Sequence, residues 1–195
     1  MGKSKNLHQR IGSYFREGAG HPPRVQTLLR SLCRIEVEPM GSDLEAMLGE
    51  AAKIRRQEPA HNVHRSHRIR DESAKRLRSI LILEPAARPW VLRAYLLRDG
   101  RLLEKVGVGR RGGGLRRIER ILEDHYFSFE NRPTSGTGPE VDVEIVARWL
   151  ASNRDRVVAF DPTDLRSARE VTDRLRWFLD KGELQDPDGA PILVR

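Results

Sequence analysis

The stretch "SDLEAMLGEAAKIRRQEP", residues 42–59, decides the first part of the fold, because it holds a complete helix together with its start and stop signals. Ser42 and Glu45 have the spacing of a capping box, in which a side chain and a backbone N–H satisfy each other at a helix start. Pro59 cannot continue the helix. An apolar stripe follows helical spacing: Leu44, Met47, Leu48, Ala51 and Ile54. The segment therefore predicts an amphipathic helix.

Upstream of this helix the sequence predicts two shorter helices and one strand. The first helix runs from a cap at Ser4 to Phe15 and the second spans residues 24–33, "RVQTLLRSLC". The apolar side of the first helix is formed by Leu7, Ile11, Tyr14 and Phe15. Residues 34–38 alternate apolar and polar side chains, with Ile35 and Val37 on one face, which predicts a strand. Cys33 follows the helical leucines and is predicted to be a small core residue.

Downstream, a polar and basic linker leads to a second domain, with a boundary at residues 66–75. The predicted domains are therefore 1–68 and 75–195, and the predicted fold class is α+β. In the second domain we expect a strand at "SILILEP", a hairpin over residues 90–109 and a short strand at "RVVAF". Asp99-Gly100 supplies the positive φ angles of a tight hairpin turn. Helices are predicted at 116–127, 141–153 and 164–180, the last capped near Asp161 or Thr163.

The charge of the chain favours an anionic partner. The 195 residues include 38% apolar and 33% charged residues and carry a net charge of +8, with a pI of about 10.2. Residues 1–70 hold 13 Lys and Arg against 7 Asp and Glu, whereas residues 71–195 hold 23 against 21. If the partner is nucleic acid, the first 70 residues are the expected surface, although a charge excess can also serve solubility alone.

The composition also indicates the cellular compartment of the protein. A single cysteine allows no intrachain disulfide, which favours a reducing environment. No apolar run approaches the roughly 20 residues of a membrane span, and the N-terminus lacks the hydrophobic stretch of a signal peptide. These features predict a cytoplasmic protein with no membrane partner.

Two stretches carry a resemblance to a known family: "GKSKNLHQRIGSYF", residues 2–15, and "IEVEPMGSDLEAMLGEAAKIRRQEPAHNV", residues 35–63. In order, spacing and residue type they resemble the N-terminal nuclease domain of the bacterial excinuclease C subunit, of the GIY-YIG superfamily. The resemblance implies a small antiparallel sheet with flanking helices. It also implies a metal-dependent DNA endonuclease of nucleotide excision repair.

The resemblance assigns roles residue by residue. It places a metal-binding glutamate at Glu50, phosphate-handling cations at Lys3 and Arg10, and further site residues at Tyr14 and Asn62. The implied cofactor is Mg²⁺ or Mn²⁺ and the implied partners are DNA and other excision-repair proteins. A carboxylate is a hard oxygen ligand that suits these ions, and a guanidinium fork suits a phosphate. Each residue also has an explanation without a catalytic role. Glu50 can be a solvated helix glutamate, and Lys3 and Arg10 can form a basic helix face that only makes the protein soluble. Tyr14 can belong to the helix core, and Asn62 can be a turn residue after Pro59.

The resemblance further implies that the family's two signature tyrosines would precede Met1, which stands at the Val or Ile position of that motif. We therefore expect a start codon assigned within a longer reading frame, a first domain that is poorly stabilised alone, and little activity without the missing tyrosine base.

Two other motifs leave alternatives open. "GVGRRG", residues 107–112, matches a dinucleotide-binding string after a strand. It also fits a basic loop that touches a phosphate backbone, or an ordinary turn. "HNVHRSH", residues 61–67, spaces three histidines evenly, but a solvated linker explains them better than zinc. "YLLRDGRLLEKV" and "RRIERILEDHYF" resemble, with low specificity, the region that follows the nuclease domain in excinuclease C. Besides the endonuclease, a non-catalytic DNA-binding or scaffold protein and a dinucleotide-binding enzyme remain as alternatives, and no small-molecule cofactor is expected.

Overall fold

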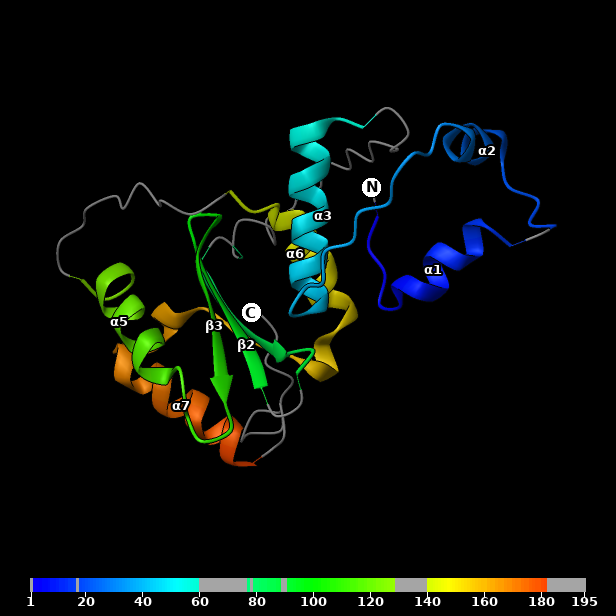
Figure 1. The fold of residues 1–195 in the computed structure, drawn as a ribbon. Helices are drawn as coiled ribbons and strands as arrows, with labels where there is room; N and C mark the ends of the chain where they lie inside the picture. The colour runs from blue at the N-terminus through cyan, green and yellow to red at the C-terminus, as the bar shows by residue number, and fades with distance from the viewer. Residues whose placement is uncertain are drawn as a thin grey trace. The chain divides into compact units, whose positions relative to one another are not determined.

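The computed structural model describes residues 2–16, 18–59, 77, 79–88, 91–128 and 140–181. The chain divides into two compact units, residues 1–67 and 68–195, and each is treated by itself (Figure 1). Helices and an antiparallel sheet are both present, so the predicted α+β class is confirmed. Asn62 and the three histidines of residues 61–67 lie outside the described residues. None of the described helices combines the length and the apolar character needed to cross a lipid bilayer.

In the first unit the part of the chain that the structure describes forms three helices: α1 (Leu7–Tyr14), α2 (Pro23–Arg30) and α3 (Asp43–Gln57). The predicted cap of α3 is confirmed, because the Ser42 side chain accepts a hydrogen bond from the backbone N–H of Glu45. The cap predicted for α1 is wrong: Asn6, not Ser4, caps the helix, with its Oδ1 2.9 Å from the Gln9 nitrogen. An Asn side chain at this position satisfies a first-turn N–H that would otherwise lack a partner.

The strand predicted at Ile35 and Val37 is not formed. Within the described residues of the first unit no segment forms a strand, so no neighbour supplies the inter-strand hydrogen bonds that a strand requires. Ile35 is 46% and Val37 56% exposed. Cys33 is exposed as well, which corrects its predicted place in the core.

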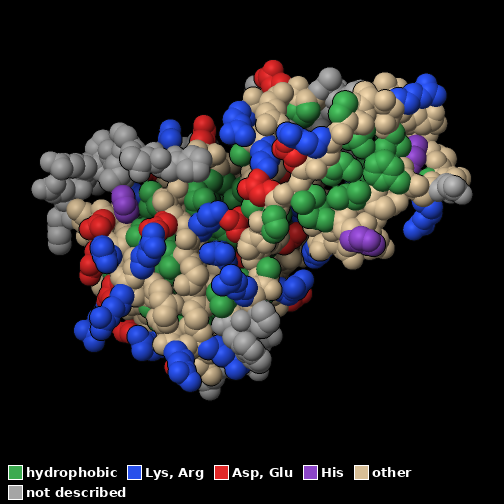
Figure 2. All heavy atoms as spheres, viewed as in Figure 1, with side chains coloured by type: hydrophobic (Ala, Val, Ile, Leu, Met, Phe, Trp, Pro, Cys, Tyr) green, Lys and Arg blue, Asp and Glu red, His purple; other side chains and the backbone are tan. Residues whose placement is uncertain are grey.

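Apolar side chains of the first unit remain at its surface. Helices α1 and α2 have no buried residue, and Phe15 is 57% exposed. Figure 2 shows hydrophobic side chains gathered at the surface of the region that contains α1 and α2. The helical periodicity of α1 is therefore real, but the apolar face that it predicts is not buried.

The second unit is built on a four-stranded antiparallel sheet with the order β3-β2-β1-β4. Its strands are β1 (Ile80–Pro85), β2 (Val91–Arg98), β3 (Arg101–Gly109) and β4 (Val158–Phe160). Asp99 (φ 52°) and Gly100 (φ 76°) form the turn between β2 and β3, as the sequence predicts. Five consecutive residues of β1 are buried; the first four, Ile80–Leu83, form the apolar run of a strand covered on both faces, and the fifth is Glu84.

The described residues of this unit form three helices: α5 (Leu115–His125), α6 (Val143–Ser152) and α7 (Ala168–Lys181). Short 3-10 turns span Arg154–Arg156 and Pro162–Asp164. The last helix begins later than predicted, because Asp161 caps the second of these turns rather than α7.

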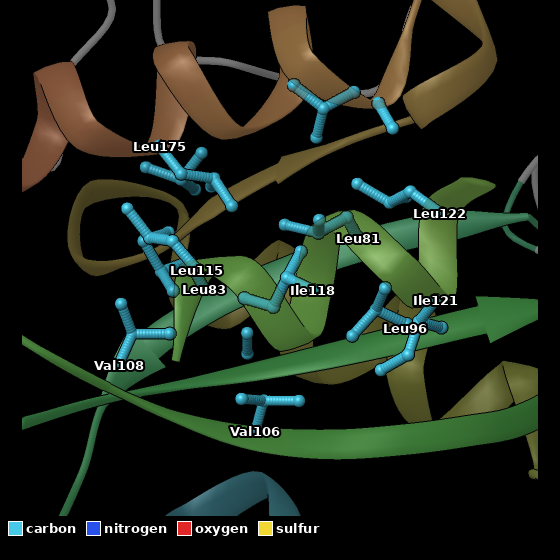
Figure 3. Packing of buried hydrophobic residues seen from close by; sticks show 14 of the residues in the cluster. Leu81, Leu83, Leu96, Val106, Val108, Leu115, Ile118, Ile121, Leu122 and Leu175 are labelled. Atoms are coloured by element: carbon cyan, nitrogen blue, oxygen red, sulfur yellow. The ribbon is translucent and has the colours of Figure 1, made fainter. Parts of the chain in front are cut away.

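A hydrophobic core of the described residues lies between the sheet, α5 and α7. Figure 3 shows Leu81 and Leu83 of β1 directed toward Ile118 of α5. The labelled members of this core are Leu81, Leu83, Leu96, Val106, Val108, Leu115, Ile118, Ile121, Leu122 and Leu175. Fixing α5 against the sheet in this way also fixes the direction of the side chains on its exposed face.

Candidate functional site

Glu50 and the N-terminal segment lie together. Glu50 is half-buried in the middle of α3. Its Oε1 is 3.8 Å from the position that a Cβ on Gly2 would occupy. Because Lys3 is the next residue, the structure brings the predicted carboxylate close to the chain segment that carries one of the predicted cations. A larger side chain at position 2 would come into direct contact with this carboxylate.

Lys3 has a partner that the sequence reasoning missed. Its Nζ is 2.8 Å from Oδ1 of Asp43, and both side chains are about one-third exposed or less. Asp43 precedes Glu50 by seven residues, which is close to two helical turns, so both carboxylates lie on the same side of α3. That spacing is visible in the sequence. The ion pair holds the Lys3 ammonium near the N-terminal end of α3.

Arg10 and Tyr14 form a second group on α1. The guanidinium carbon of Arg10 lies 5.3 Å from the centroid of the Tyr14 ring, a cation–π distance. The sequence reasoning also missed His21. Its imidazole ring stacks on the Tyr14 ring, with 5.9 Å between the ring centroids. Its Nε2 is 3.1 Å from the Tyr14 carbonyl oxygen. Tyr14 thus contacts both a cation and an imidazole.

The predicted site residues therefore fall into two groups in this structure. Lys3 and Glu50 belong to the α3 group, and Arg10 and Tyr14 belong to the α1 group. No hydrogen bond or ion pair joins Arg10 to Glu50 among the residues described. The described part of the chain also contains no cluster of three or more His, Cys, Asp or Glu that could hold a metal ion. A metal at Glu50 would then depend on water and substrate oxygens for most of its ligands, as Mg²⁺ commonly does.

The "GVGRRG" loop does not have the surroundings of a dinucleotide site. Its first three residues are the end of β3, which pairs antiparallel with β2 at the edge of the sheet. A dinucleotide fingerprint lies between a parallel strand and its crossover helix. The strand that precedes this loop is therefore of the wrong kind for that function.

Comparison with known proteins identifies the class of the first unit. Residues 1–63 match the family model described as the UvrC-like GIY-YIG domain. The resemblance drawn from residues 2–15 and 35–63 is thereby confirmed, and a GIY-YIG domain is present at the N-terminus of the chain.

The relatives found among curated proteins carry the name UvrABC system protein C. The one from Bdellovibrio bacteriovorus is 35% identical over 74 residues, which is 38% of this chain and 11% of that protein. The one from Oleidesulfovibrio alaskensis is 36% identical over 63 residues, or 32% of this chain and 9% of that protein. The one from Synechococcus sp. strain CC9311 is 40% identical over 63 residues, or 32% and 10%. The match thus spans about a tenth of these relatives. No solved structure matches the chain.

Proposed function

We propose that this chain is a GIY-YIG-type DNA endonuclease related to nucleotide excision repair, and that it hydrolyses phosphodiester bonds. The observation that supports this most is the match of residues 1–63 to the UvrC-like GIY-YIG domain, together with the position of Glu50 beside Gly2 and Lys3. DNA is the proposed substrate and other excision-repair proteins are the proposed partners. We also propose a cytoplasmic location, which is supported by the reducing environment that a single cysteine favours.

Each site residue has a proposed part in the reaction. Glu50 would hold Mg²⁺ or Mn²⁺ through one carboxylate oxygen, and the bound ion would neutralise phosphate charge and lower the pKa of a bound water. Lys3 and Arg10 would contact the phosphate as negative charge develops on its oxygens. Tyr14 would orient Arg10 through the ring contact that the structure contains. Asn62 would donate a hydrogen bond to the phosphate or to bound water.

A second candidate is a DNA-binding or scaffold protein without catalytic activity. It is favoured by the separation of the site residues into two groups, because the Lys3 ammonium is paired with Asp43 and the Arg10 guanidinium lies over Tyr14. A phosphate that binds at Glu50 through a metal would have to compete with Asp43 for the Lys3 ammonium. A protein that only binds the DNA backbone needs no such rearrangement.

A nicking assay on supercoiled plasmid with Mg²⁺ or Mn²⁺ separates the two candidates. For the endonuclease we expect metal-dependent nicking at a low rate, in line with the little activity that the sequence predicts, and this nicking should fall at least 100-fold or so in Glu50→Gln, since such a site stabilises charge in the transition state. The matched control is Glu58→Gln, which removes an exposed carboxylate just beyond the same helix and should nick as wild type does. Nicking that survives Glu50→Gln contradicts the assignment of the metal ligand. Salt-sensitive DNA binding without nicking supports the second candidate.

A further inference from the structure

A segment of the second unit concentrates positive charge at the surface. Between residues 105 and 120 the sequence has six Lys and Arg and one Glu. All six cations are exposed, and we call residues 105–120 the basic segment. Its cations are Lys105, Arg110, Arg111, Arg116, Arg117 and Arg120. Figure 2 shows Lys and Arg side chains along the side of the molecule where α5 and the loop before it lie. The net charge of residues 71–195 is close to zero, so this local excess of positive charge is not evident from the total.

The backbone that carries the basic segment is fixed. Gly114, the residue before α5, has φ 96°, and a Cβ there would lie 2.3 Å from the Gly107 carbonyl oxygen. Inside the loop, Gly112 donates to the Gly109 carbonyl at 2.8 Å and Gly109 donates to the Gly113 carbonyl at 3.0 Å. Leu115 and Ile118 bury the opposite face of α5 in the core. The arginines are therefore presented from a set position rather than from a free loop.

The charged side chains of α5 are placed unfavourably for the helix dipole, with cations at its N-terminal end. Arg116 and Arg117 lie in the first turn, which contains no acidic residue, and the N-terminus has no side-chain cap. Glu123 and Asp124 lie toward the other end. A helix N-terminus carries partial positive charge and is stabilised by anions, so this arrangement is unfavourable in the isolated protein. An anionic partner over the first turns would remove the conflict.

Three of these arginines form no hydrogen bond or ion pair with the described residues. Arg117 forms an ion pair with Glu104 of β3. By contrast, the described residues provide no hydrogen bond or ion pair to Arg111, Arg116 or Arg120. Arg116 and Arg120 are one turn apart, and so project from the same side of α5. Their exposed guanidinium groups are available to a ligand without the loss of an existing contact.

We propose that Arg111, Arg116 and Arg120 form a second DNA-contact surface that binds the phosphate backbone of duplex DNA. The choice of DNA rests on the function proposed above for the first unit. A duplex fits better than a single strand, because residues 105–120 contain no aromatic side chain on which an unstacked base could stack. Contacts to phosphates position a protein on DNA without reading its sequence, so this surface would hold the duplex independently of base sequence.

The test measures the affinity of the full chain for a labelled duplex between 50 and 200 mM salt. The variant replaces Arg111, Arg116 and Arg120 with Gln. Each phosphate contact steepens the dependence of log K on log salt by roughly 0.9, so over this fourfold range wild type should lose about 40-fold more affinity than the variant. The matched control replaces Arg148, Arg154 and Arg156, which are also exposed, with Gln and removes the same charge. It should keep the wild-type slope.

Further variants and substrates make each outcome decisive. Replacing the same three arginines with Lys should preserve the slope, since the charge remains. Equal flattening of the slope in both Gln variants, or no binding of wild type to the duplex, overturns the proposal. Tighter binding to an RNA duplex of the same sequence overturns the choice of DNA. The nicking assay is separate: if wild type does not nick the plasmid but its salt dependence still differs from that of the Gln variant as expected, the proposed nuclease is rejected and this surface is retained.

Discussion

At Gly114 a single side-chain carbon decides whether the connection from β3 to α5 can form. Its φ of 96° is strained for any other residue, and a Cβ would clash with the Gly107 carbonyl oxygen. We expect Gly114→Ala to lower the free energy of unfolding by roughly 3 kcal/mol or more. Urea denaturation followed by circular dichroism measures this loss.

Gly113 provides the control for that substitution, because a Cβ there meets no atom within 4 Å. Gly113→Ala should change the free energy of unfolding by only about 0.5 kcal/mol in either direction. If the two alanine variants were equally stable, the close approach of Gly114 to β3 would be incorrect, and so would the fixed presentation of the basic segment.

Tyr126 contributes a buried hydrogen bond at the other end of α5. Its hydroxyl donates to the Leu97 carbonyl oxygen at 2.5 Å. Burial raises the pKa of this hydroxyl above its ordinary value, the negative charge of Asp161 raises it further, and Arg98 opposes the shift. The unfolded protein therefore loses this proton first as the pH rises.

Two results should follow from Tyr126→Phe. At pH 7 the free energy of unfolding should fall by about 1 to 2 kcal/mol, because the carbonyl loses its partner. Above about pH 10, the ordinary pKa of tyrosine, wild type should lose stability more steeply than the variant, because the folded state retains a proton that the unfolded state has released. Urea titrations from pH 7 to 11 test both. Parallel curves above pH 10 would contradict the pKa shift.

At the scale of single elements, α5 shows a conflict between folding and the proposed binding. Replacing Arg116 with Glu puts an anion in the first turn, which should stabilise the folded protein by about 0.3–1 kcal/mol while weakening its binding to duplex DNA. Arg120→Glu makes the same charge change one turn later, beside Glu123 and Asp124 at helical spacing, where like charges repel. It should weaken DNA binding without stabilising the fold. Thermal unfolding and duplex titration of both variants, at low salt, check this prediction.

Two results would contradict the proposed role of α5 in binding DNA. If Arg116→Glu destabilised the free protein, the arginine would have an intramolecular role, and the charge conflict in α5 would not point to a ligand. If both variants bound DNA as tightly as wild type, the basic segment would be a solvated surface.

Elements with strong local signals could be predicted from the sequence. Asp99-Gly100 fixed the β2–β3 turn, and Ser42 with Glu45 fixed the start of α3, because both depend on residues a few positions apart. The strand at Ile35 and Val37 failed for the opposite reason: a strand needs a partner from elsewhere, and alternation alone does not supply one. The start of α7 was misplaced because Asp161 caps a 3-10 turn with the same side-chain chemistry that caps an α-helix.

The candidate site was predictable only in part. The family resemblance identified Glu50 and Lys3, which the structure places on neighbouring segments. It gave no indication of the pairing of Lys3 with Asp43 or of the contact between Tyr14 and His21. These contacts join residues that are distant in sequence or that lie in a loop, and their formation depends on tertiary packing rather than on a local pattern.

For the whole molecule, the two units differ in how much apolar surface they bury. The second unit encloses a core with fully buried residues such as Leu81, Leu96 and Ile118. In the first unit, α1 and α2 are eight residues each and bury no residue. Isolated helices of this length are marginal in water, and helices gain most of their stability from packing an apolar face. Local opening should therefore cost far less free energy in α1 and α2 than in the sheet.

Amide hydrogen exchange resolved by peptide measures this difference. Amides of β1 and β2 should exchange slowest, at rates near the limit set by global unfolding, and amides of α1 and α2 should exchange orders of magnitude faster. Helix α3, with its capped start and one buried leucine at Leu44, should be intermediate. Duplex DNA should slow exchange at the first turn of α5 if the basic segment binds it, and at α1 if Arg10 contacts phosphate. Protection of α1 equal to that of β1 in the free protein would contradict this order, because it would require a buried face that α1 does not have.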